Sequence, residues 1–234
     1  MDSKPYLKQM NYYNTLAKFL SYPTKSFGRD LDKAFAEFSK THPDIAESLL
    51  PFMNYVHNTS LEETEEIFNR TFDVQALTTL DIGYVLFGDD YKRGQLLVHL
   101  GNEHSAVQND CYGELADHLP NVLRLLPLLK DEMLRQELVQ RIILPALSKM
   151  QSEFGEKQIS AKEKVYKKHH TLLIEKSDDY YLVYRCVLAA IYQTLTLDFG
   201  EEWVDENLPR SNGFTQSASA ELTIESDIVQ KSTL

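Results

Sequence analysis

The chain has 234 residues, 43% hydrophobic and 25% charged, which is typical of a globular protein and excludes a wholly disordered chain. Its nine glycines and eight prolines amount to about 7% of the residues, against a usual share of about 12%, so the tight turns of a β-sandwich or β-barrel are hard to supply. The net charge of −11 argues against nonspecific nucleic-acid binding, which needs clustered positive charge, and favours a basic partner. We therefore expect an all-α fold.

The cysteines and the apolar runs predict the compartment. Cys111 and Cys186 are far apart and form no CxxC, so the sequence predicts neither a disulfide framework nor a zinc site, and we expect reduced thiols. No uninterrupted apolar run reaches membrane-spanning length, and the first residues lack the apolar core of a signal peptide. We expect a cytoplasmic protein without stable membrane insertion.

Apolar residues at helical spacing predict a series of helices in the first half of the chain. The first runs from Met10 to Leu20 and ends at Tyr22-Pro23, because the residue before a proline disfavours helix. Further helices are expected over 31–38, from Pro43 to Val56, and over 61–72. The glutamates of the last of these indicate a solvated face rather than paired catalytic carboxylates.

The pattern continues through the second half. A short apolar stretch from Leu80 is broken at Gly88 and resumes as a helix to Leu100. Later helices are expected over 113–130, 131–154 (kinked or divided at Pro145), 161–174 and 179–199. Polar and acidic residues dominate beyond Trp203, so we expect one helical domain over residues 1–205 and a flexible tail over 206–234.

Catalytic and cofactor motifs give only weak signals. The glycines at 83, 88 and 94 do not fit GxGxxG, and the chain contains neither a GxSxG elbow nor HExxH. His99 and His104 are five residues apart, so they do not share a helix face as i, i+4 metal ligands do. We expect no catalytic activity, no metal and no cofactor.

Two stretches are less generic. Residues 87–94 place a glycine, carboxylates, an aromatic ring and cations between apolar segments, as in a turn whose aspartate caps the next helix. In residues 114–120, either Asp117 is the N-cap of a helix with Pro120 at its third position, or one continuous helix is kinked at Pro120. Both alternatives put Asp117 and His118 near a broken helix end, whose free backbone amides are a natural contact point for a ligand.

These stretches resemble the redox-enzyme maturation chaperones of the TorD, DmsD and NarJ type, most of all the NarJ (nitrate reductase delta subunit) branch. Residues 19–23 are similar to the family's apolar helix end with Tyr-Pro, and Phe72-Asp73 to its Phe-Asp pair. Gly88-Asp89 and Arg93-Gly94 resemble its Gly-acid and Arg-Gly elements. Residues 114–120 resemble its Glu-Leu-x-Asp-His-Leu-Pro signature. The resemblance covers roughly residues 7 to 130, and the rest matches only as helical pattern.

The resemblance implies a single-domain, all-α, non-catalytic protein. Family members bind the N-terminal segment of a molybdopterin oxidoreductase catalytic subunit and hold it while the molybdenum cofactor and iron–sulfur clusters are inserted, before membrane docking or twin-arginine export. The partners implied are that segment and, beyond it, molybdenum-cofactor biosynthesis proteins. The peptide groove carried over to this chain involves Asp117, His118 and Phe72, with turn residues as further candidates: Tyr84, Phe87, Asp89 and Arg93.

Physical reasoning agrees with this implication: an amphipathic peptide would lay its apolar face between helices while its arginines meet carboxylates such as Asp89 and Asp117. Two alternatives stay open. One is a helical enzyme or a carrier of molybdenum cofactor or nucleotide, and the other is a structural subunit that remains in a mature complex.

Overall fold

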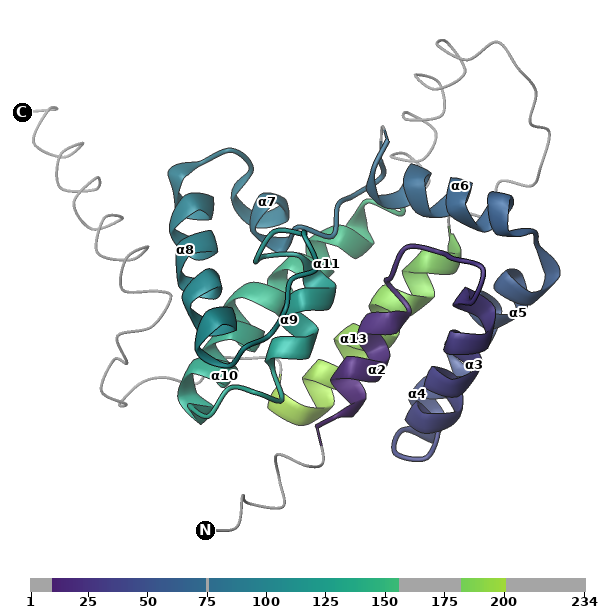
Figure 1. Ribbon diagram of the computed structural model, residues 1–234, viewed down its shortest axis with the longest axis horizontal. Helices are drawn as coiled ribbons and strands as arrows, with labels where there is room; N and C mark the ends of the chain where they lie inside the picture. Colours follow the sequence, from purple (N-terminus) through teal and green to yellow (C-terminus); the bar gives the residue numbers. More distant parts are fainter. Residues whose placement is uncertain (1–9, 75, 156–181, 201–234) are drawn as a thin grey trace, which may run out of the picture.

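The computed structural model describes residues 10–74, 76–155 and 182–200, and in these ranges it is all-α, as the sequence predicts. Apart from one isolated β-bridge, the described ranges contain helices, turns and loops but no strand. Figure 1 shows their arrangement. The helices are α2 (Tyr12–Lys18), α3 (Phe27–Phe38), α4 (Pro43–Glu47), α5 (Leu50–Asn58), α6 (Leu61–Phe72), α7 (Ile82–Phe87), α8 (Tyr91–Ala106), α9 (Leu119–Leu125), α10 (Glu132–Leu138), the π-helix η1 (Val139–Ile143), α11 (Leu144–Ser152) and α13 (Leu182–Phe199).

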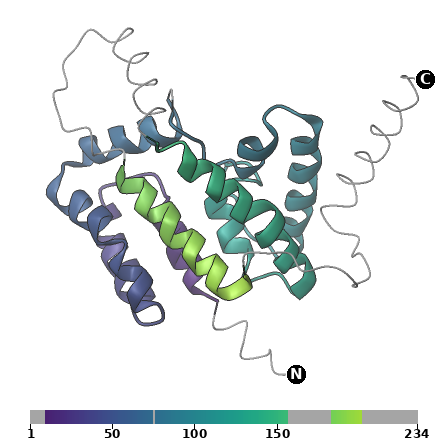
Figure 2. The same ribbon diagram turned by 180° about the vertical axis from the view of Figure 1, so that it is seen from behind.

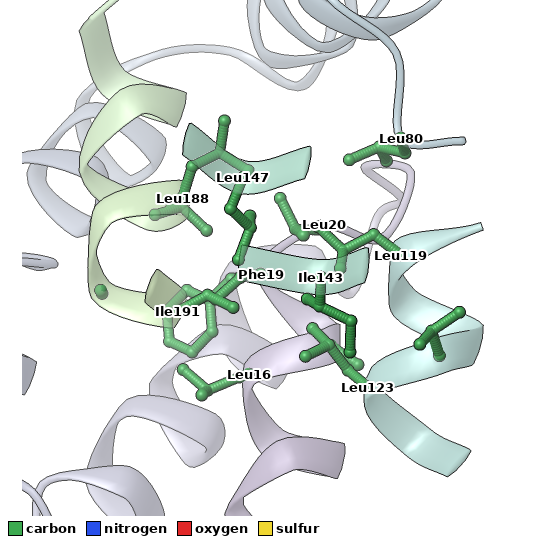
Figure 3. Packing of buried hydrophobic residues seen from close by; sticks show 14 of the residues in the cluster. Leu16, Phe19, Leu20, Leu80, Leu119, Leu123, Ile143, Leu147, Leu188 and Ile191 are labelled. Atoms are coloured by element: carbon green, nitrogen blue, oxygen red, sulfur yellow. The ribbon is translucent and has the colours of Figure 1, made fainter. Parts of the chain in front are cut away.

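The first and last described helices run through the middle of the molecule. Helix α2 packs against α3 and α9, and α13 packs against α11 and α5 (Figures 1 and 2). Their apolar side chains meet in one core, in which Figure 3 shows Phe19, Leu123, Ile143 and Ile191 converging from four segments of the chain. This core is the fixed body against which the more polar segment 76–81 and the loop 107–118 are held.

Most predicted helices are confirmed in the first half of the chain. Helix α6 has the predicted bounds, and a capping box closes its first turn: the Glu63 amide donates to the Ser60 hydroxyl, and the Ser60 amide donates to the Glu63 carboxylate. The helix expected from Pro43 to Val56 is instead divided into α4 and α5. Pro51 lies in the first turn of α5, where its missing amide hydrogen costs nothing, so it starts a new helix.

The helix predicted over 113–130 is wrong. Helix α9 begins only at Leu119, with His118 as its N-cap and Pro120 at its second position. Neither alternative for Asp117 holds, since it caps no helix and lies in the turn directly before the bridge residue His118. A proline inside a continuous helix would collide with the carbonyl four residues earlier, and this collision is avoided when the helix starts next to Pro120.

The breaks expected at Gly88 and Pro145 are confirmed. Gly88 has φ 62° and ψ −136°, a conformation that favours glycine, and it separates α7 from α8, whose N-cap is Asp90. Pro145 lies in the first turn of α11, directly after the π-helical η1. Because Pro145 has no amide hydrogen to donate, the wider π turn next to it accommodates the gap in the hydrogen-bond ladder.

The last apolar helix is confirmed as α13, which buries Tyr184, Leu188 and Ile191 among other residues. Cys186 packs against the same core, and its thiol donates to the Val183 carbonyl at 2.9 Å. The predicted helix over 161–174 and the tail over 206–234 lie outside the described residues, so the predicted domain boundary stays a prediction. No helix in the described ranges is both long and apolar enough to cross a membrane.

Candidate functional site

An antiparallel contact between two extended segments assembles the candidate site. The Ile82 amide donates to the Asp117 carbonyl at 3.0 Å, and the Leu119 amide donates to the Leu80 carbonyl at 2.8 Å. These two bonds form a β-bridge that pairs Asp81 with His118. Backbone pairing therefore brings together two polar residues that are far apart in the sequence.

Arg93 of α8 connects the two sides of this bridge. Its Nη2 donates to Asp81 Oδ2 at 2.9 Å, and its Nε donates to Asp117 Oδ2 at 3.0 Å. His118 Nδ1 lies 3.1 Å from Asp81 Oδ1, where its N–H donates to the carboxylate. The guanidinium carbon of Arg93 also lies 5.2 Å from the centre of the Tyr84 ring, within the range of a cation–π contact. Asp81, Arg93, Asp117 and His118 form what we call the bridge network.

The two carboxylates of the bridge network lie in different environments. Asp117 has no exposed surface, and burial raises the pKa of its carboxyl although Arg93 partly offsets this. Asp81 is partly exposed, and the hydrogen bond from His118 lowers the pKa of its carboxyl despite partial burial. Among the described residues, Asp117 Oδ1 has no hydrogen-bond partner, so Asp117 depends on Arg93 for its compensation.

Glycine at position 83 is a requirement of this packing. A Cβ added to Gly83 would lie 2.6 Å from Asp117 Oδ2 and 3.0 Å from a methyl carbon of Leu96. Only a residue without a side chain lets α7 approach the buried carboxylate so closely.

A cavity of about 680 Å³ opens on one side of the bridge network, between α2 and α9. Its walls combine aromatic rings, carboxylates, cations and hydroxyls. Its lining residues include Lys18, Tyr22, Phe68, Phe72, Asp73, Thr79, Asp81, Tyr112, Glu114, His118, Asn121 and Arg124. We call this the first cavity.

A second cavity of about 740 Å³ adjoins the first on the side of α7 and α11. The two share four lining residues: Phe72, Asp73, Thr79 and Asp81. Tyr84, Arg93, Lys149 and Glu153 line the second cavity alone. Together the two spaces, which we call the paired cavities, offer an apolar floor at Phe72 with carboxylates of Asp73 and Asp81 beside it.

The structure separates the predicted site residues into three groups. Phe72, His118, Tyr84 and Arg93 line the paired cavities. Asp117 is close to them but fully buried, and its carboxylate is already paired with Arg93 of the same chain. The prediction that this carboxylate meets a client arginine directly is therefore wrong for this structure. Phe87 packs against the core and Asp89 is exposed after the Gly88 turn, and neither is among the residues that line the paired cavities.

Several lining residues were not found by the sequence analysis. Asp81 belongs to the bridge network, and Tyr112, Asn121 and Arg124 form one wall of the first cavity. The assumption of a helix over 113–130 concealed this wall, although Tyr112-Gly113 is a turn signal that could have pointed to a loop.

Within the described ranges, no group of three or more His, Cys, Asp or Glu side chains is placed to hold a metal ion. The site combines open cavities, aromatic walls and charges of both signs. No protein-family model matches this chain, and neither does any curated protein.

Proposed function

We propose that this protein is a cytoplasmic assembly chaperone of the TorD, DmsD and NarJ type, which binds the N-terminal segment of a molybdopterin oxidoreductase catalytic subunit. It holds that segment while molybdenum cofactor and iron–sulfur clusters are inserted. It releases the segment when the client folds around its cofactors, and it performs no catalysis of its own.

One observation carries the proposal. Four of the seven residues that the resemblance assigns to peptide binding, Phe72, Tyr84, Arg93 and His118, come from four separate segments and line the paired cavities. The gathering of these side chains therefore supports a binding role.

The chemistry of the walls suits an amphipathic peptide. Phe68, Phe72 and Tyr22 supply apolar surface in the first cavity, and burial of such surface contributes roughly 25 cal/mol per Å² before the cost of ordering the peptide is subtracted. The exposed carboxylate of Asp73 lies where a basic side chain of the peptide would enter, whereas Asp81 is already paired with Arg93 and His118. The net charge of −11 speeds the approach of a basic segment.

The proposal is tested by affinity capture with the full chain from anaerobically grown cells of the source organism. We expect a molybdopterin catalytic subunit to be captured, and a synthetic copy of its N-terminal segment to bind in calorimetry. His118→Ala should weaken that binding by about 1–3 kcal/mol while the fold survives.

His57→Ala is the matched control, because His57 pairs with Asp32 at 2.8 Å on the exposed surface of α5, outside the residues that line the paired cavities. Equal affinity of the two variants would reject the site. Stoichiometric pterin, metal or nucleotide in the purified protein would favour a cofactor carrier instead. Retention of one copy in the active enzyme would favour a structural subunit.

A further inference from the structure

Arg124 of α9 is a cation whose position the bridge network does not explain. It is half-buried in the first cavity and is not among the residues that line the second. Its Nη2 donates to the Asn121 side-chain oxygen and, at 3.4 Å, to the Asp110 carbonyl. Its Nε is buried and has no hydrogen-bond partner among the described residues. The guanidinium is thus held in place by neutral groups.

The contrast with Arg93 shows what Arg124 lacks. Arg93 contacts two carboxylates, whereas Arg124 forms no ion pair with any described residue. Burial lowers the pKa of the Arg124 guanidinium, and Tyr112, Cys111 and Asp110 only partly offset this. A half-buried cation that lines an open cavity and forms no ion pair with a described residue is suited to an anion supplied from outside.

The loop beside Arg124 contains a residue, Tyr112, in an unfavourable backbone conformation. Tyr112 has φ 52°, in the left-handed region that non-glycine residues rarely adopt, and the residue is 74% exposed. Its ring centre lies 4.9 Å from the guanidinium carbon of Arg124. The buried Asn121 side chain fixes this loop by donating to the carbonyls of Cys111 and Leu115, at 3.2 and 3.0 Å. An exposed aromatic ring is therefore held over one face of the Arg124 guanidinium.

The first cavity is lined by charges of both signs. Lys18 of α2 lies on the wall formed by the other helix, is exposed, and makes no ion pair with a described residue. The carboxylates of Asp73 and Asp81 belong to the part that is shared with the second cavity. Glu114 is exposed on the loop and also lines a further surface depression around His104. The cavity thus has the cations of Lys18 and Arg124 in its walls, together with the carboxylates of Asp73, Asp81 and Glu114.

We propose that Arg124, Lys18 and the Tyr112 ring form a subsite for an acidic side chain of the bound peptide, so that the protein selects a segment carrying an aspartate or glutamate in addition to its apolar and basic residues. The planar guanidinium fork matches a carboxylate better than any neutral group. This inference rests on the proposed function and adds a determinant of client choice that the resemblance does not assign.

Selection from a library of displayed random 15-residue peptides on the full chain tests the subsite. The wild type should enrich peptides with aspartate or glutamate at one position relative to the apolar anchors. Arg124→Glu should reverse the preference there to lysine or arginine, which a purely structural role of Arg124 would not do. Arg29→Glu on the exposed face of α3 makes the same charge change outside the cavities and should leave the wild-type preference intact.

Calorimetry then quantifies the effect with the peptide most enriched on the wild type and its Glu→Gln (or Asp→Asn) copy. The acidic form should bind the wild type about tenfold more tightly, and Arg124→Glu should abolish or invert the difference. If Arg124→Glu does not fold, Lys18→Glu tests the subsite instead. Lys18 is exposed, so its charge reversal should weaken the preference for an acidic peptide and leave the packing of the core unchanged.

Each outcome of the selection has a distinct meaning. Apolar or basic peptides without an acidic preference, or a preference that both charge reversals leave unchanged, would overturn the subsite and leave the proposed function standing. Failure to enrich any peptide would overturn the proposed function and the subsite together.

Discussion

Helix α6 and the loop 107–118 line the same cavity but are held by different kinds of interaction. The start of α6 is fixed by residues three apart, through the Ser60–Glu63 capping box. The loop is fixed by side chains from the helices around it: His104 of α8 lies 3.0 Å from the Ala116 carbonyl, and Asn121 of α9 donates to two carbonyls. One wall is thus encoded locally, and the other exists only once the helices around it have packed.

This difference has a physical consequence. A helix stabilised by its own sequence tolerates changes elsewhere in the protein, because its capping and its apolar stripe are intact in the isolated segment. A loop held by buried side chains loses its conformation when one anchor is removed, since its carbonyls are left without partners. Substitutions in the anchors should therefore cost more than substitutions in the helix cap.

The largest effect is expected from Gly83→Ala. The new Cβ would lie 2.6 Å from the buried Asp117 carboxylate and 3.0 Å from Leu96, so the bridge network or α7 must shift. We expect a loss of about 2–4 kcal/mol in the free energy of unfolding, measured by urea denaturation.

Gly94→Ala is the control for this substitution. Gly94 lies in α8 and a Cβ there would meet no atom within 4 Å, so alanine should stabilise the protein by about 0.5–1 kcal/mol through higher helix propensity. Similar losses at both positions would show that the close approach at Gly83 has no special importance.

Asn121→Ala should have the next largest effect. It leaves the carbonyls of Cys111 and Leu115 and the Arg124 side chain each without one partner, and we expect a loss of about 2–3 kcal/mol. Hydrogen exchange should accelerate at amides of the loop 107–118. Asn58→Ala, which removes an exposed bond to the Asn54 carbonyl, should cost only a few tenths of a kcal/mol, and equal effects would contradict the proposed role of Asn121.

The same contrast explains which parts of the fold could be predicted. Apolar spacing identified α3, α6 and α13, since in these helices periodic residues are the ones that become buried. The spacing failed at 113–118, where Leu115 fits a helical stripe with Leu119 but is 48% exposed in a loop. Periodicity does not record that Pro120 and the buried anchors favour an extended approach to α9.

The candidate site was predicted in part. The resemblance identified Phe72, Arg93 and His118 as site residues, and the structure brings them together around open cavities. Asp81 could not be found in this way because its partners Arg93 and His118 are set by the β-bridge and by the packing of α8. A contact between distant segments leaves no spacing in the sequence from which it could be inferred.

The two carboxylates of the bridge network should respond to pH in opposite directions. Asp117 has a raised pKa, so its contribution to stability is full below the ordinary value of 3.8 and is lost as pH rises through the folded pKa. Asp81 has a lowered pKa, so its contribution is present above 3.8 and is lost as pH falls through the folded pKa.

Asparagine variants measure this difference because asparagine does not titrate. Relative to wild type, Asp117→Asn should be least harmful near neutral pH, whereas Asp81→Asn should be most harmful there. Urea unfolding at several pH values between about 3 and 7 gives both curves. Parallel curves for the two variants would show that burial and the His118 hydrogen bond do not distinguish the two carboxylates.

The smallest effect is expected in the locally encoded wall. Ser60→Ala removes the hydroxyl that accepts from the Glu63 amide at 3.2 Å and should lower the free energy of unfolding by about 1 kcal/mol. Glu62→Ala is the matched change in the same turn, outside the capping box, and should cost only about 0.3 kcal/mol through the helix dipole. Because the apolar face of α6 remains intact, Ser60→Ala should leave peptide affinity unchanged. Asn121→Ala should weaken the affinity, because the loop that carries Tyr112 loses its hydrogen bonds to Asn121. A loss of affinity in Ser60→Ala as large as that in Asn121→Ala would mean that the two walls are not independent, and that the first cavity depends on the stability of the whole domain rather than on the anchors of its loop.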